Sequence, residues 1–186
     1  MIPPASVETD DRVRLFCALT LPDDVLDRVV EWQHGPSFPI PETRLVPREN
    51  LHVTLAFLGA RPARELPAIC RELEAAAGTA GRVRLRVRGY RATRNVGMLV
   101  CEDIGRAATT MASDLHGRLQ GIGVYKPEHR RWLPHITVLR FREKPAFSPV
   151  YPPLDAFSPS GAAVYHSVLR RTGAEYVVLH AVVLGG

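Results

Sequence analysis

The sequence predicts an α+β fold, in which one domain is built from two related halves. The chain has 186 residues and 46% hydrophobic content, which suits a single medium-sized core. Segments that alternate between apolar and polar residues, as strands do, are interleaved with segments of helical periodicity. A strand pattern that contains histidine occurs twice, at positions 83 residues apart, close to half the chain length. This repetition indicates two similar α+β halves.

The first half is predicted to alternate between strands and helices. A helix is expected where Pro22 is followed by two aspartates and then by apolar residues at helical spacing. A proline-rich irregular connection should follow, and the next strand should stop at Gly59. The expected elements are a strand at 14–19, a helix from residue 22, a connection at 35–50, a strand at 51–59 and a helix at 63–77.

Residues 82–88 show a strict alternation that predicts another strand. Its apolar residues would face one side and its arginines the other. The arginine row is a candidate track for a polynucleotide, and the alternative is a sheet surface that faces solvent. The four cations are Arg82, Arg84, Arg86 and Arg88.

The second half continues in the same way. Two strands are expected at its end, joined by a turn at Gly173, and we expect them to bring the C-terminal segment beside the first strand. The predicted elements are strands at 96–101 and 133–141 around a helix at 106–120, a proline-rich stretch at 145–159, and strands at 163–169 and 176–184.

Composition narrows the function classes. With 23% charged and 7% aromatic residues, the chain is not of a disordered, collagen-like or coiled-coil class. The net charge is +5, and only Lys126 and Lys144 are lysines, so 22 of the 24 basic residues are arginines. Arginine suits phosphate recognition, which makes a polyanionic partner one interpretation. The other interpretation is that the excess of arginine over lysine reflects only codon composition.

Targeting signals and cysteine use predict a cytoplasmic protein. The three cysteines, Cys17, Cys70 and Cys101, are odd in number and lack C-x-x-C spacing, and the first residues lack the apolar core of a signal peptide. No stretch approaches the roughly 18 consecutive apolar residues that a membrane span needs. We therefore expect no membrane association, and a monomer.

The duplicated pattern consists of histidine, an apolar residue, threonine and an apolar residue. It occurs as LHVTL at residues 51–55 and as PHITV at residues 134–138. In a strand, His52 and Thr54 would share one face, as would His135 and Thr137. Chance alone gives roughly 0.1 such matches in a chain of this composition.

Two such histidines in equivalent positions are typical of acid and base catalysis. If the strands are equivalent, both imidazoles and both threonine hydroxyls meet in one groove. Histidine can act as base or acid near neutral pH. The alternative is that each histidine is a half-buried strand residue whose ring bonds to a neighbouring carbonyl.

With these motifs the chain resembles the two-histidine phosphoesterases, and within them the LigT-like RNA 2′,3′-cyclic phosphodiesterases, also called 2′-5′ RNA ligases. The resemblance implies a bilobal fold of mostly antiparallel sheets that line a central cleft, with helices outside. It also implies metal-independent hydrolysis of cyclic phosphate ends to 2′-phosphates, and in reverse 2′-5′ ligation of RNA. The segments that carry it are RLFCALTLP, VPRENLHVTLAFLG, PHITVLRF and SVLRRTGAEYVVLHAVVL.

The resemblance assigns roles to residues by matching position. His52 and His135 become catalytic, Thr54 and Thr137 bind phosphate oxygens, and Phe57 and Arg140 flank the site. Where this family often has tryptophan, the chain has Leu45.

Arg140 lies five residues after its histidine, so a regular strand would aim it away from the cleft. A bulge or the strand's end is needed to bring it to the phosphate. Phe57 has the same offset from His52, which favours an irregularity common to both strands. Just before the second motif, Arg130 and Arg131 are candidates for RNA phosphate contacts and Trp132 for base stacking, with a solvated loop and buried packing as the alternatives.

The mechanism follows from the chemistry of a strained cyclic phosphodiester. Its opening by water needs a base for the water and an acid for the leaving ribose oxygen. We assign His135 as base and His52 as acid, with the reverse assignment open, and expect the imidazoles about 5–9 Å apart.

No cofactor or metal is expected. Neither a phosphate-binding GxxxxGK[ST] loop nor a strand-linked GxGxxG is present. The remaining histidines, His34, His116, His129, His166 and His180, lack metal-ligand spacing. Expected partners are RNA with 2′,3′-cyclic phosphate ends or cyclic mononucleotides. The alternatives are a hydrolase of another cyclic or 2′-5′-linked nucleotide, and a catalytically silent RNA-binding protein.

Overall fold

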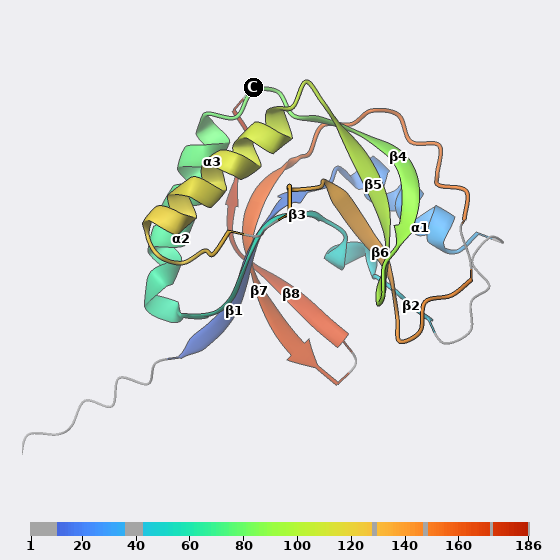
Figure 1. Cartoon of the computed structure of the whole chain (residues 1–186), viewed down its shortest axis with the longest axis horizontal. Coiled ribbons are helices and arrows are strands. Elements are labelled where there is room, and N and C mark those ends of the chain that lie inside the picture. Colours follow the sequence, from blue (N-terminus) through green and yellow to red (C-terminus); the bar gives the residue numbers. More distant parts are fainter. Residues whose placement is uncertain (1–10, 36–42, 128–129, 147–148, 172, 186) are drawn as a thin grey trace, which may run out of the picture.

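An eight-stranded, curled sheet with three helices outside it makes up the computed structural model (Figure 1). The structure describes residues 11–35, 43–127, 130–146, 149–171 and 173–185. The strands are β1 (Arg12–Thr20), β2 (Thr43–Leu45), β3 (Val53–Pro62), β4 (Arg84–Ala92), β5 (Val96–Ile104), β6 (His135–Phe141), β7 (Gly161–Arg170) and β8 (Gly173–Val182). The α-helices are α1 (Asp23–Gln33), α2 (Leu66–Gly78) and α3 (Ala107–Gly121), and single 3-10 turns lie at Arg48–Asn50 and Ala63–Glu65.

The sheet forms two lobes that meet between β3 and β6. The strand order is β4-β5-β6-β3-β1-β7-β8, with β2 paired to β6, and all these pairings are antiparallel. Among the described residues, β3 and β6 pair only at Val53 and Ile136. Helices α2 and α3 pack together over the lobe of β1, β3 and β7, whereas α1 lies at the other lobe (Figure 1). This arrangement confirms the expected α+β, mostly antiparallel fold.

The predicted helices and strands are present, with differences in where they end and what they pair with. The prediction that the second strand stops at Gly59 is wrong, because β3 continues to Pro62. Gly59 has a φ of 70° and lies at a shift of the pairing register with β1, so it bends the strand without ending it. Within the expected irregular connection, residues 43–45 form the short strand β2, and residues 36–42 lie outside the described residues.

Of the two C-terminal strands, only one lies directly beside the first strand. The expectation that they return beside the first strand is confirmed for β7, which pairs with β1 along six residues. Strand β8 pairs with β7 and forms the edge of the sheet. That the two halves are related by an internal repeat remains a prediction.

The alternating strand residues separate two apolar clusters. Side chains such as Leu15 and Leu19 of β1 pack with Leu73 of α2 and Leu115 of α3 in the main core, between sheet and helices. The intervening residues of β1 lie on the opposite face, where a smaller cluster contains Phe16, Ala18, Ala163 and Tyr165. Because the helices cover only one face, the other is left to form a cleft. No helix among the described residues is long and apolar enough to cross a bilayer.

Candidate functional site

Strand β3 contains a bulge directly after its histidine motif. Cys17 of β1 pairs with Ala56 and Ala18 pairs with Thr54, so Leu55 is an extra residue in β3. A bulge shifts the alternation of side chains by one position. Phe57 therefore faces the same side as Thr54, and its side chain is 48% exposed.

Strand β6 contains a bulge at the equivalent position. Gly97 of β5 pairs with Leu139 and Met98 pairs with Thr137, which leaves Val138 as the extra residue. Arg140 consequently shares a face with Thr137 and is exposed. The predicted irregularity common to both strands is confirmed, since Leu55 and Val138 each lie three residues after the histidine of their motif.

The contact between β3 and β6 brings the two motifs together. Val53 pairs antiparallel with Ile136, the central residue of the other motif. Continuing this register places His52 beside Thr137 and Thr54 beside His135, with the two histidines on a diagonal. Diagonal positions of an antiparallel pair lie about 7–8 Å apart along the backbone, and the 5–9 Å spacing expected for the imidazole rings stays a prediction.

Both imidazole rings are held in the same way. His52 Nδ1 lies 2.8 Å from the carbonyl oxygen of Asn50, and His135 Nδ1 lies 2.8 Å from that of Leu133. A carbonyl only accepts, so Nδ1 carries the hydrogen in each ring, and in the neutral form Nε2 has the free lone pair. His52 Nε2 is 3.1 Å from Thr54 Oγ1, whose hydroxyl therefore donates to the neutral ring.

Aromatic side chains surround His52 on the cleft face. The ring centroid of Phe16 lies 4.9 Å from that of His52, Tyr176 lies at 5.4 Å and Tyr165 at 6.0 Å. None of these three residues was predicted from the sequence. For Phe16 the signal was weak because strand 14–19 is apolar on both faces, so its pattern does not mark a side that faces a site.

This environment favours neutral His52. Burial lowers the pKa of His52 to about 4; the bond to Asn50 opposes this effect, while the positive charges of His135 and Arg140 add to it. That His135 and Arg140 act on His52 electrostatically agrees with their shared location. Burial also raises the pKa of Tyr165, which keeps its phenol neutral.

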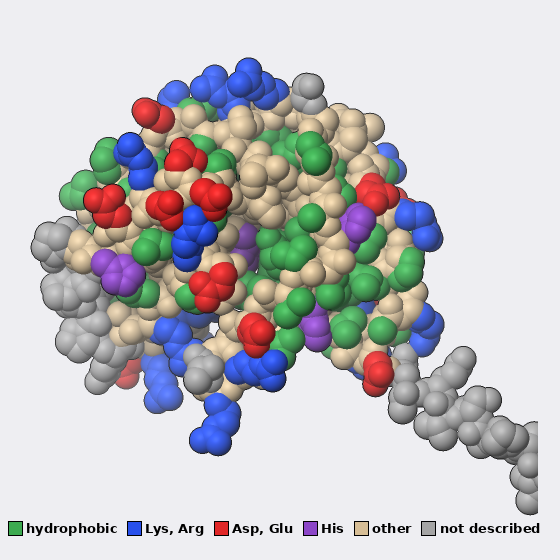
Figure 2. All heavy atoms as spheres, turned by 180° about the vertical axis from the view of Figure 1, so that it is seen from behind, with side chains coloured by type: hydrophobic (Ala, Val, Ile, Leu, Met, Phe, Trp, Pro, Cys, Tyr) green, Lys and Arg blue, Asp and Glu red, His purple; other side chains and the backbone are tan. Residues whose placement is uncertain are grey.

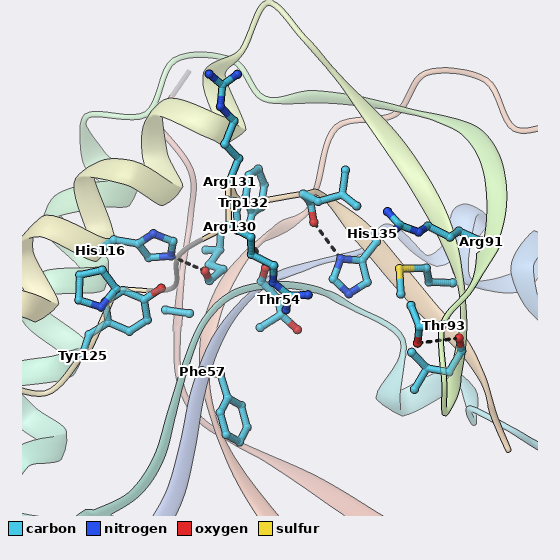
Figure 3. A pocket seen from close by; sticks show the side chains of 16 residues that line it. Thr54, Phe57, Arg91, Thr93, His116, Tyr125, Arg130, Arg131, Trp132 and His135 are labelled. Atoms are coloured by element: carbon cyan, nitrogen blue, oxygen red, sulfur yellow. Dashed lines mark hydrogen bonds between the residues drawn. The ribbon is translucent and has the colours of Figure 1, made fainter. Parts of the chain in front are cut away.

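A pocket of about 950 Å³ extends from the histidine motifs across one side of the cleft (Figure 3). Of the predicted site residues, Thr54, Phe57, Arg130, Trp132 and His135 line it. His52, Thr137 and Arg140 are not among its lining residues, so the predicted set is divided between the pocket and the adjoining strands. Arg131, the second candidate for RNA phosphate contacts, also lines the pocket, together with Arg91, Thr93, Met98, His116 and Tyr125.

The aromatic residues of this pocket already have partners. The Trp132 indole donates to the backbone oxygen of Thr54 at 2.9 Å, and His116 stacks on Tyr125 with ring centroids 4.6 Å apart. Arg14 covers one face of the Phe57 ring, with its guanidinium carbon 4.8 Å from the ring centroid. Trp132 thus has a structural hydrogen bond in addition to its place in the pocket wall.

Arginines approach the pocket from two sides (Figure 3). Arg130 and Arg131 come from the segment before β6, and Arg91 comes from β4. Arg91 was not predicted as a site residue, because the expected strand ended at residue 88. In the structure β4 continues through a register shift between Val87 and Gly89.

No cluster of three or more His, Cys, Asp or Glu side chains suited to a metal ion occurs among the described residues. His129, one of the histidines considered for metal binding, lies outside those residues. The polar groups gathered at the motifs are instead imidazoles, hydroxyls and guanidinium groups. Such a set is suited to proton transfer and to binding an anion.

Comparisons with known proteins agree on one family. The model of a family described as the 2′-5′ RNA ligase superfamily matches residues 21–175. An RNA 2′,3′-cyclic phosphodiesterase of Thermus thermophilus is 34% identical over 186 aligned residues, which cover 94% of this chain and 91% of that protein. One from Escherichia coli is 31% identical and covers 68% of this chain and 71% of its own length. A crystal structure of a Thermus thermophilus protein superposes with a TM-score of 0.81 at 28% identity, over 93% of this chain and 98% of the other.

Proposed function

The chain belongs to the 2′-5′ RNA ligase superfamily, and from this premise we propose that it hydrolyses the 2′,3′-cyclic phosphate ends of RNA or nucleosides to 2′-phosphates. The observation that carries the proposal is the matched pair of imidazoles. Each ring donates Nδ1–H to a carbonyl two residues earlier, on strands that meet at a single antiparallel contact among the described residues. Nε2 of both rings then serves one substrate, once the Thr54 hydroxyl that donates to His52 Nε2 turns to a phosphate oxygen.

The reaction opens the strained ring at phosphorus. A water oxygen forms a bond to phosphorus while the bond from phosphorus to the ribose 3′ oxygen breaks, with entry and exit in line. The base takes a proton from the water, and the acid gives one to the 3′ oxygen. The product keeps its phosphate on the 2′ oxygen.

The two histidines divide these tasks. We assign His135 as base and His52 as acid. His52 is neutral in the free protein, so the acid role requires that the negative charge of the bound phosphodiester raises its pKa. The reverse assignment, with neutral His52 as base, needs no such rise, and a substrate whose leaving group needs no proton separates the two.

Hydroxyl and guanidinium groups complete the phosphate site. Thr54 and Thr137 present their hydroxyls beside the histidines, and Arg140 shares their strand face because of the β6 bulge. Donors that are already in place stabilise charge on the phosphoryl oxygens as the ring opens. The pocket beside them takes the nucleoside, with Phe57, Trp132 and Arg130 in its wall.

A row of arginines on β4 supports RNA as the substrate. The register shift at Arg88 places Arg84 and Arg86 on the same sheet face as Arg91, which lines the pocket. Glu102 pairs with Arg86 and with Arg88, so the row is partly neutralised. Figure 2 shows Lys and Arg side chains gathered at the upper rim, where Figure 1 places the start of β4. A polynucleotide that extends from the pocket along this face of β4 would contact Arg91 at the pocket and then Arg84 and Arg86 further along the strand.

The test is product identity with the metal chelated. Purified protein is incubated with 2′,3′-cyclic mononucleotides and EDTA, and the products are separated as 2′- and 3′-phosphates. Formation of the 2′-phosphate supports a metal-independent hydrolase, and the same enzyme supplied with a ribose 5′-hydroxyl would give 2′-5′ ligation. Activity that vanishes with EDTA and returns with zinc would overturn the metal-independent mechanism, and RNA binding without product would favour a silent RNA-binding protein.

Location and oligomeric state form part of the proposal. Cys17, Cys70 and Cys101 are free thiols, which suits a reducing cytoplasm. We propose a monomer, because both histidine motifs of the site come from one chain.

A further inference from the structure

Each of the two bulges leaves a backbone carbonyl that a helix side chain holds. The oxygen of Leu55, the extra residue of β3, accepts a hydrogen bond of 2.7 Å from His116 Nε2 on α3. The oxygen of Val138, the extra residue of β6, accepts one of 2.7 Å from Gln33 Nε2 on α1, in addition to a backbone bond of 3.0 Å from the N–H of Val46. Different helices thus contact the same position of the two motifs.

The position of Gln33 suits it to hold the carbonyl of the β6 bulge. Its side chain is 2% exposed, at the last residue of α1, and its Nε2 also lies 3.0 Å from the oxygen of Val46. The two amide hydrogens are therefore both used, one on the bulge and one on the segment that precedes the first histidine motif. Because the Gln33 side chain is buried, water cannot replace these two hydrogen bonds.

The β3 bulge is held from two directions. His116 donates to Leu55, and the Trp132 indole donates to the preceding residue, Thr54. His116 is in turn fixed by its stacking on Tyr125, with an interplanar angle of 20°. Thr54 and Phe57 are the residues on either side of the bulged pair.

We propose that Gln33 and His116 are positioning residues that stabilise the bulges and so aim Arg140 and Phe57 into the cleft. The inference rests on the proposed function, since it assigns the side chains of Arg140 and Phe57 to substrate binding. A regular β6 would direct Arg140 to the opposite face, because a shift of one residue reverses the side that a strand residue faces. The bulges are thus part of the site, and the helices outside the sheet maintain them.

The test compares Gln33→Leu in two backgrounds. In the otherwise unchanged protein, loss of both amide bonds should lower kcat/KM for a cyclic nucleotide by about 10- to 100-fold, because small displacements of site residues are costly. In an Arg140→Ala background the same change should cost less than about threefold, since Gln33 acts through Arg140. Equal losses in both backgrounds would show that Gln33 stabilises the fold only, and would overturn the proposal.

A control variant and a structural readout separate a positioning role from a general loss of stability. Trp32→Phe removes a 2.7 Å bond from the same helix to the oxygen of Val150, away from the bulges, and should show no coupling with Arg140. A crystal structure of Gln33→Leu should show a changed β5–β6 register, and an unchanged bulge would contradict the inference without any activity measurement. An inactive unmodified protein would refute the proposed function alone, since the register readout still applies.

His116 provides an independent test if Gln33→Leu does not fold. His116→Phe keeps the stacking on Tyr125 but removes the donor to Leu55. Its loss of activity should be largely absent in a Phe57→Ala background, and His116→Gln, which retains a donor, should recover part of the rate. A full loss in both backgrounds with no recovery would refute the role of His116.

Discussion

Val53 pairs with Ile136 at the one point where β3 and β6 meet among the described residues, and each is the central residue of a histidine-x-threonine motif. The histidines and threonines of the two motifs flank this contact. On one side of it lie His52 and Thr137, and on the other Thr54 and His135. A backbone contact between two buried apolar residues therefore sets the spacing of the polar groups around it.

A substrate whose leaving group needs no proton should show which histidine is the acid and which is the base. His52→Ala and His135→Ala should each lower turnover of a 2′,3′-cyclic nucleotide at least about 100-fold. On bis(p-nitrophenyl) phosphate, whose leaving group needs no proton, His52→Ala should retain most of the activity and His135→Ala should not. The opposite result would make His52 the base, and His34→Ala, on the exposed end of α1, serves as the control.

Stability should fall in acid partly because of His52. Its pKa of about 4 in the folded protein lies below the reference value of 6.5, so between these values the unfolded chain takes up a proton that the folded protein does not. This proton lowers the free energy of unfolding by up to about 3 kcal/mol between pH 7 and pH 4. Urea unfolding of the unmodified protein and of His52→Gln should therefore differ more in pH dependence than in stability at pH 7. Parallel curves would contradict the shifted pKa.

The aromatic cluster around His52 should control its pKa. Tyr176→Ala opens one side of the ring to water, and since burial is the largest cause of the low pKa, the pKa should rise from about 4 toward 6.5. An NMR titration of the imidazole carbon-bound protons measures this directly. Tyr151→Ala, at an exposed position elsewhere, should leave the titration unchanged. A Tyr176→Ala protein with the original pKa would assign the shift to other groups.

The β4 arginines should matter for RNA and not for mononucleotides. Arg84→Ala with Arg86→Ala should raise KM for an oligonucleotide with a cyclic phosphate end, and should reduce the salt dependence of its binding, because phosphate contacts are lost. Turnover of a cyclic mononucleotide should stay the same. The matched control replaces Arg28 and Arg71, exposed arginines of α1 and α2. Equal effects of both pairs on the oligonucleotide would indicate net charge and not a track.

Activity against pH should follow a bell-shaped curve, since one histidine must be neutral and the other protonated. The measurement is kcat/KM for a cyclic mononucleotide across pH 3.5 to 9, because a His52 pKa of about 4 in the free protein places the acid limb below pH 5. A flat profile with chemistry rate-limiting would exclude paired acid and base catalysis.

Periodicity and motif spacing located most of the fold. The alternation in residues 82–88 predicted a strand, and the arginines are exposed while Val83, Leu85 and Val87 are buried. The parity of Phe57 and Arg140 relative to their histidines even indicated the bulges. These are local properties, because the direction of a side chain along a strand depends on position parity and on bulges in that strand.

The hydrogen-bond partners and spatial neighbours of a residue could not be predicted from the sequence around it. Gln33 precedes Val138 by 105 positions and His116 follows Leu55 by 61, and no pattern near either residue marks a carbonyl as its target. The same holds for Tyr165 and Tyr176, which surround His52 only because β7 lies beside β1 and β8 beside β7.

The sequence by itself determined the two histidine-x-threonine motifs and the strand face that their residues would share. Only the tertiary structure decided that the two motifs meet at Val53 and Ile136, that burial keeps His52 neutral, and that side chains of α1 and α3 donate hydrogen bonds to the bulged residues. The physical reason is one of range. Alternation along a strand follows from backbone geometry within a few residues, whereas burial, pKa and hydrogen-bond partners depend on segments that packing alone brings together.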